Sequence, residues 1–148
     1  MALSLLEIVR SEYKTSRASD DMNSRFQALL GLPHRYGPAR LAIGRSLGIP
    51  SVPELDLTVM GYGKPIKGEH LFGTGIELAA WVSLVVEHAG QPDLDRRDFQ
   101  ALVAAHWQRG MTALWDDWRA SGTDFDSFVT RLVKHSARPQ TVTKTAVA

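Results

Sequence analysis

The most apolar segment of the chain, IELAAWVSLVVEH at residues 76–88, constrains the fold more than any other feature. Its hydrophobic side chains fall at nearly every angle around a helix, which is typical of a helix buried on all sides. A domain of 148 residues has few places for such a helix. We therefore expect it at the centre of the core or covered by another subunit, and we favour an oligomer. Gly90 and Pro92 predict its end.

Most of the remaining chain also has helical patterns. We expect a short helix through SRFQALLG that stops at Gly31, a helix that begins at Pro38 and ends at Gly48, a long helix from about Asp95 to Arg119, and amphipathic turns from Phe125 to Val133 after a capping-box-like Thr123–Asp126. LTVM and KPIK, joined by GYG, predict a weak hairpin. The fold class is therefore mainly α, a small compact helical domain with a short β-hairpin. This domain spans 1–135, and 136–148 is expected to be a flexible polar tail.

Gly110 interrupts the middle of the long predicted helix. A glycine at such a position costs about 1 kcal/mol relative to alanine, so a compensating contact is expected. A close crossing with another helix would supply that contact. We assign Gly110, together with three residues of the apolar helix, to an oligomer interface: Trp81, Leu84 and Val85.

Several function classes have no support in the sequence. There is no cysteine, which excludes disulfides and thiolate chemistry, and no apolar run is long enough to span a bilayer. Gly68 and Gly73 have the glycine spacing of a phosphate-binding P-loop, but the required lysine is missing after Gly73. Glu69 and His70 resemble an acid–base pair, yet no nucleophile or orienting group accompanies them. We expect no catalytic residue, metal or cofactor, and a cytoplasmic location.

The five histidines are scattered, and His106 lies among apolar positions of the long helix, where a hydrogen-bonded core histidine is expected. The charge is also unevenly distributed. Residues 1–53 carry seven basic and four acidic side chains, whereas 76–134 carry six and nine. A basic N-terminal region favours an anionic partner, and a solvated surface is the alternative interpretation. The candidate contacts with phosphate are Arg35, Arg40, Arg45, Lys64 and Lys67.

The order of several short motifs resembles the DndE family of bacterial DNA phosphorothioation systems. The motifs are ARLAIGRSL followed by PSVP, then IKGEHLFG, then HWQRGMTAL, and the likeness covers about residues 15–133. The resemblance implies a small helical protein that self-associates as a tetramer, with a ribbon-helix-helix-like N-terminal part. It also implies binding to nicked double-stranded DNA, beside a cysteine desulfurase, a sulfurtransferase and an ATPase.

Two other functions remain open at the level of sequence. One is a ribbon-helix-helix transcriptional regulator, which would read DNA through a short strand near residues 12–15. The other is an adaptor that binds only proteins of the same system. The first hypothesis, which the resemblance implies, is a non-enzymatic, oligomeric DNA-binding and scaffolding subunit of a DNA-modification complex. A chain without cysteine cannot carry a persulfide, so in a sulfur pathway it is expected to position DNA or partners.

Overall fold

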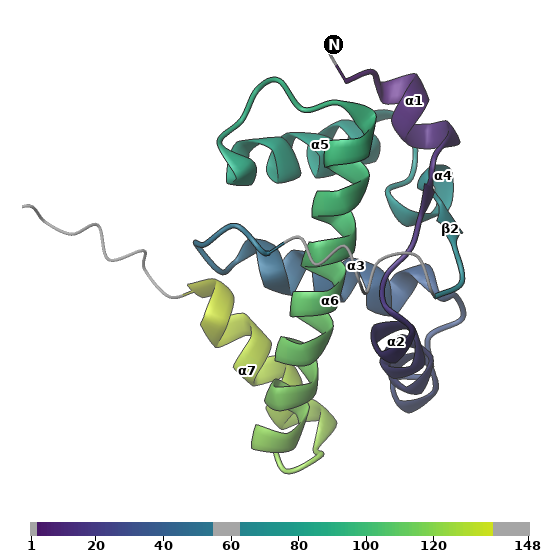
Figure 1. Cartoon of the computed structure of the whole chain (residues 1–148). Helices are drawn as coiled ribbons and strands as arrows, with labels where there is room; N and C mark the ends of the chain where they lie inside the picture. Colours follow the sequence, from purple (N-terminus) through teal and green to yellow (C-terminus); the bar gives the residue numbers. More distant parts are fainter. Residues whose placement is uncertain (1–2, 55–62, 138–148) are drawn as a thin grey trace, which may run out of the picture.

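The computed structural model describes residues 3–54 and 63–137. The described chain is mainly helical with one two-stranded antiparallel sheet, as the sequence predicts (Figure 1). Its elements are α1 (Leu5–Arg10), β1 (Glu12–Tyr13), α2 (Arg17–Leu29), α3 (Tyr36–Leu47), β2 (Ile66–Lys67), α4 (Gly68–Leu71), α5 (Gly75–Ala89), α6 (Arg96–Ala120) and α7 (Phe125–Ala137). Of the tail predicted for 136–148, residues 136 and 137 belong to α7. The rest of that tail lies outside the described residues.

The long helix α6 forms the axis of the fold, and α3 crosses it near the middle (Figure 1). Gly110 lies at this crossing, where a β-carbon would overlap the carbonyl group of Ala42. Both residues are buried. The predicted close crossing is therefore confirmed, and the partner is α3 of the same chain. The assignment of Gly110 to an oligomer interface is wrong, because the residue is enclosed in the core of a single chain.

The apolar helix α5 lies at the periphery, and it packs on α1, α3 and α6 with one side (Figure 1). Only Leu78 and Val85 are fully buried, whereas Ile76 is 89% exposed and Leu84 is 51% exposed. The expectation of a central helix is wrong, and Val85 belongs to the core and not to an interface. Trp81 is half-buried and packs against the core. No helix within 3–54 and 63–137 is long and apolar enough to cross a membrane.

Two aromatic clusters fill the core on either side of the α3–α6 crossing. Near the start of α6, the ring of Tyr13 meets Phe72 and Phe99 edge-on, with centroid distances of 5.1 and 6.0 Å. Near its end, Phe26 meets Trp115 edge-on at 5.0 Å and packs against Phe128 of α7. Such edge-to-face pairs contribute about 0.5–1.5 kcal/mol each beyond the area they bury.

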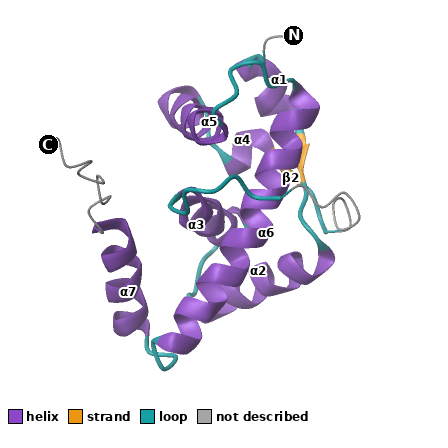
Figure 2. Ribbon diagram, turned by 60° about the vertical axis from the view of Figure 1, so that its left-hand side comes forward, coloured by secondary structure: helices purple, strands orange, loops and turns teal. Residues whose placement is uncertain are grey.

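The small sheet joins segments that are far apart in the sequence (Figure 2). Glu12 pairs with Lys67 and Tyr13 pairs with Ile66 in antiparallel register. The second strand of the predicted hairpin is therefore present as β2, and its described partner is β1. The first strand of that hairpin falls on 57–60, outside the described residues. The order β1–α2–α3 is that of a ribbon-helix-helix element, but here the strand pairs within its own chain.

Residues at the helix ends explain where α5 ends and where α6 and α7 begin. Asp95 caps α6, since its carboxylate accepts the backbone N–H of Asp98 and the Asp98 carboxylate accepts the N–H of Asp95. Gly90 ends α5 in the left-handed conformation with φ of 65°. At α7 the cap is Asp124, which accepts from the N–H of Ser127, and not the predicted Thr123.

Candidate functional site

Arg35, a predicted phosphate contact, holds parts of its own chain together. One terminal nitrogen donates to Asp20 Oδ1 at 2.7 Å and to the Lys64 carbonyl at 3.2 Å, and the other donates to the Pro65 carbonyl at 3.5 Å. Asp20 also accepts the backbone N–H of Lys64. These bonds hold residues 64 and 65, which lead into β2, against Asp20 of α2. Most of the donors of Arg35 are consequently unavailable to a partner.

Arg40 has a similar structural role on α3. Its Nε donates to the Leu71 carbonyl at 2.8 Å, and a terminal nitrogen donates to the His70 carbonyl at 2.9 Å. The guanidinium also stacks over the Tyr36 ring, 4.4 Å from its centroid. These bonds satisfy the last carbonyls of the short helix α4 and tie it to α3.

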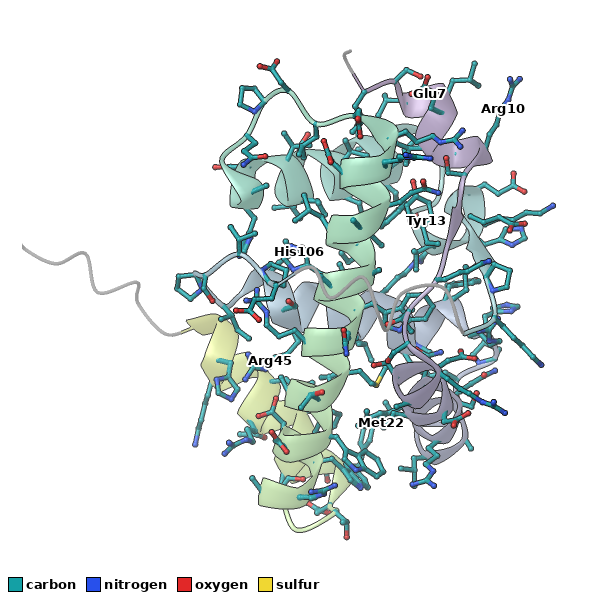
Figure 3. All side chains as sticks on the ribbon, viewed as in Figure 1. Glu7, Arg10, Tyr13, Met22, Arg45 and His106 are labelled. Atoms are coloured by element: carbon teal, nitrogen blue, oxygen red, sulfur yellow. The ribbon has the colours of Figure 1, made fainter. Side chains whose placement is uncertain are left out.

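Arg45 is on α3, and its side chain binds a buried carboxylate on α6 (Figure 3). Its Nε donates to Asp117 Oδ2 at 2.8 Å, while Arg131 Nε and His135 Nε2 donate to Asp117 Oδ1 at 2.8 and 3.2 Å. Burial alone would raise the pKa of Asp117. The hydrogen bonds from Arg45 and Arg131 outweigh that effect, and the net pKa is lowered.

The two predicted lysines differ from the arginines, because both side chains are exposed. Neither forms an ion pair among the residues that the structure describes. On β2, Ile66 points into the core and Lys67 points outward, directly opposite Glu12. On β1, Glu12 is exposed beside the buried Tyr13, and Lys14, the residue after the strand, is exposed as well, so Glu12 and Lys14 lie on the same side as Lys67.

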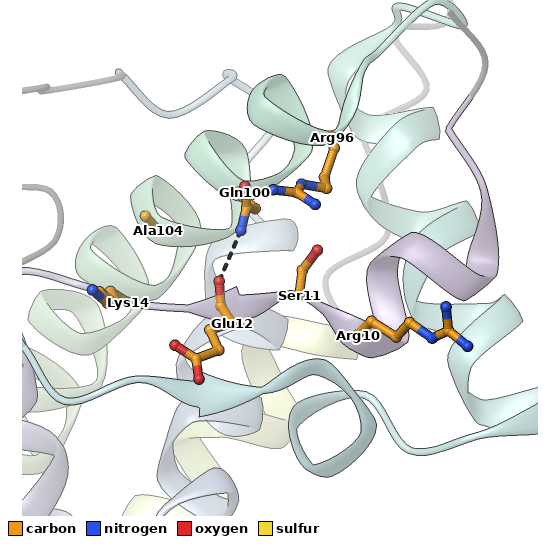
Figure 4. A pocket seen from close by; sticks show the side chains of 7 residues that line it. All are labelled: Arg10, Ser11, Glu12, Lys14, Arg96, Gln100 and Ala104. Atoms are coloured by element: carbon orange, nitrogen blue, oxygen red, sulfur yellow. Dashed lines mark hydrogen bonds between the residues drawn. The ribbon is translucent and has the colours of Figure 1, made fainter.

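An open groove of about 520 Å³ lies between this strand and the first turns of α6 (Figure 4). Gln100 lines the groove, and its side-chain amide donates to the Glu12 carbonyl at 2.9 Å. We call it the β1–α6 groove, and its lining residues are Arg10, Ser11, Glu12, Lys14, Arg96, Gln100 and Ala104.

The β1–α6 groove has a positive balance, since three cations and one carboxylate line it. Arg10, Lys14 and Arg96 are exposed and form no ion pair with any described residue. Arg10 extends away from α1 into solvent (Figure 3). The three residues could not be predicted as a group from the sequence, because Arg96 lies more than 80 positions from the other two. Only the docking of β1 on α6 brings them together.

A chain of buried polar groups crosses the core beside Gly110. Arg109 Nε donates to Ser46 Oγ at 2.8 Å, and Ser46 Oγ and His106 Nδ1 share a hydrogen bond of 2.8 Å. His106 is fully buried, and burial, with contributions from His88 and Arg109, lowers its pKa from 6.5 to about 3. His88 Nε2 donates to the Ile49 carbonyl. The prediction of a hydrogen-bonded core histidine is confirmed.

The acid–base pair considered from the sequence is loosely held. His70 Nε2 and Glu69 Oε1 are 3.7 Å apart, and both side chains are largely exposed. General acid–base chemistry needs closer and more fixed groups. Across the described ranges, histidine, aspartate and glutamate form no group of three or more that could hold a metal ion.

No family model matches this chain, and no curated protein or solved structure is significantly similar to it. The resemblance to the DndE family therefore depends on the short motifs of the sequence, and what it implies stays a prediction.

Proposed function

We propose that the protein is a non-enzymatic, oligomeric DNA-binding and scaffolding subunit of a bacterial DNA phosphorothioation system. The β1–α6 groove carries this proposal. It presents Arg10, Lys14 and Arg96 in an open groove, without competing ion pairs among the described residues. Lysine and arginine contacts to phosphates supply most of the affinity of sequence-independent DNA binding.

Lys67 extends this basic surface across the outer face of the sheet, and Lys64 is exposed on the segment that leads into β2. The five predicted contacts thus reduce to these two lysines in the proposed interface. Arg35 and Arg40 are excluded from it because their donors bind carboxylate or carbonyl oxygens of the same chain, and Arg45 lies outside it, bound to Asp117. The three groove cations replace them.

The arrangement of β1 favours this proposal over a ribbon-helix-helix regulator. In such regulators two strands from different subunits pair and enter the major groove. Here one edge of β1 is paired with β2, and the Glu12 carbonyl on the other edge accepts from Gln100. β1 has two residues and its one outward-facing side chain is Glu12, so the strand offers a single side chain for base contacts.

The exposed face of α5 supports self-association, for which the resemblance implies a tetramer. Ile76, Ala80 and Leu84 recur at a spacing of four residues and are all exposed. Apolar side chains arranged in a row are typical of a protein contact. Trp81 lies beside this row and is half-buried. The cysteine desulfurase, sulfurtransferase and ATPase of the same system are the expected partners, in the cytoplasm.

Fluorescence anisotropy with labelled duplexes tests the proposal. One duplex is intact, and a second of the same sequence carries a single nick; both are titrated at several salt concentrations. We expect binding that weakens steeply with salt and tighter binding of the nicked duplex. Binding without salt dependence would contradict the phosphate contacts. No DNA binding, with retention of the partner proteins in a pull-down, would instead support the protein-only adaptor.

A further inference from the structure

A cluster of cationic side chains surrounds Asp117, well away from the β1–α6 groove. We call Arg45, Asp117, Arg131 and His135 the Asp117 cluster. Its members come from three helices: Arg45 from α3, Asp117 from α6, and the other two from α7. The Asp117 side chain is 2% exposed, whereas those of Arg45 and Arg131 are 18% and 44% exposed.

The carboxylate orients both arginines by the same atom. Each arginine donates to Asp117 through Nε, one to each oxygen, at 2.8 Å. Neither guanidinium makes another hydrogen bond to a described residue, so the four Nη–H donors of each arginine are unused. These are the donors that form a two-pronged contact with a phosphate or carboxylate group.

The charges in the Asp117 cluster do not cancel. One carboxylate faces two guanidinium groups, which leaves a net charge of +1 before any protonation of His135 is counted. The neighbouring Asp116 is exposed and forms no ion pair with either arginine. Anchoring of α7 alone would need only one arginine, because Phe128 already packs on Phe26 and Trp118. The excess positive charge and the unused N–H donors are therefore suited to binding an anion.

We propose that the Asp117 cluster binds a phosphate oxyanion, with Arg45 and Arg131 as the contacting residues and Asp117 as the residue that positions them. That the phosphate belongs to DNA rests on the proposed function; the oxyanion site itself does not. Gln100 of the β1–α6 groove and Asp117 are 17 residues apart on α6, which corresponds to about 26 Å along the helix axis. The two sites are therefore separable by mutation, and a duplex that reached both would contact opposite ends of α6.

Nuclear magnetic resonance of the ¹⁵N-labelled full chain tests this proposal through the Nε–H signals of Arg45 and Arg131. The probes are inorganic phosphate and, separately, a short intact duplex. The variants are Arg131→Gln, which removes the charge, and Arg131→Lys, which keeps the charge but loses the fork. Arg25→Gln, an exposed arginine on α2, is the matched control. The melting temperature of each variant confirms that it is folded.

We expect saturable shifts of both Nε–H signals with phosphate, and binding about tenfold weaker in Arg131→Gln, as for the loss of one charge-assisted hydrogen bond. Arg131→Lys should lie between the two, and Arg25→Gln should match the wild type. Shifts with phosphate but none with the duplex would support the oxyanion site and remove its link to DNA. Duplex binding that leaves both signals unchanged, together with no response to phosphate, would overturn the proposal and leave the groove function standing. Equal phosphate affinity in folded Arg131→Gln would also overturn it.

Discussion

Gly110 of α6 lies directly against the carbonyl group of Ala42 of α3, and no side chain separates the two helices at that point. This contact sets the distance between the axis of the fold and the helix that crosses it. A glycine in mid-helix is unfavourable by about 1 kcal/mol, so the close packing around it offsets that cost.

Gly110→Ala is expected to destabilise the protein by about 3 kcal/mol or more, because the added methyl group meets backbone atoms that cannot rotate away. Urea unfolding followed by circular dichroism measures the change. Gly44→Ala is the matched control on α3: it is exposed, and its nearest neighbour would be the Trp81 ring at 3.9 Å. That control should gain about 0.5–1 kcal/mol. Similar effects of both variants would contradict the close crossing.

His106 should make stability depend on pH. Its pKa is about 3 in the folded chain, against 6.5 for the free side chain, so only the unfolded chain takes up this proton between those values. Stability is therefore complete above pH 6.5 and falls as the pH is lowered, by at most about 1.4 kcal/mol per pH unit. His106→Asn can still accept from Ser46 but does not titrate. Its stability deficit against the wild type should shrink by about 2 kcal/mol between pH 7 and pH 5 in urea titrations. A deficit that stays constant with pH would show that His106 has the same pKa in the folded and the unfolded chain.

Arg35→Gln tests whether Arg35 stabilises the fold without contacting DNA. The substitution removes the bonds to Asp20 and to two carbonyl oxygens, and we expect a loss of about 1–2 kcal/mol in the free energy of unfolding. Duplex affinity at 20 °C should change by less than about twofold, since the chain is still folded. A large loss of duplex affinity without a loss of stability would show that Arg35 contacts DNA.

The exposed row on α5 makes a prediction about assembly. Ile76→Glu with Leu84→Glu places two charges on the row while leaving the buried Leu78 and Val85 intact. Sedimentation velocity should show the wild type as an oligomer and this variant as a monomer with an unchanged helical spectrum. The control is Leu29→Glu with Leu41→Glu, two exposed leucines on α2 and α3. If both double variants assemble as the wild type does, α5 is not the interface.

The helices could largely be predicted from the sequence, because caps and breakers such as Asp95 and Gly90 act on their immediate neighbours. The crossing at Gly110 could be predicted as well, since a glycine in mid-helix is unfavourable unless a close backbone contact requires it. The position of α5 could not. Its composition suggested burial on all sides, but burial depends on which elements pack against it, and Ile76 is left 89% exposed.

The site was predicted less well than the fold. A basic residue read from sequence can serve a partner or its own chain, and Arg35 and Arg40 bind carbonyl oxygens that no sequence pattern reveals. Lys67 was proposed as a contact because it is a basic residue in the glycine-rich segment 61–75. Arg96 was missed because its neighbours in the groove come from the other end of the chain.

The most direct test of the central claim is the affinity of Lys14→Gln with Arg96→Gln for duplex DNA across salt concentrations. Both side chains are exposed in the β1–α6 groove, so the fold should be unaffected. Arg25→Gln with Arg119→Gln removes the same charge elsewhere. We predict weaker binding by the groove variant and a salt slope that is shallower by about 1.8, as for the loss of two phosphate contacts, with no change in the control. Equal affinity and slope in the two variants would contradict the groove as the DNA-binding surface.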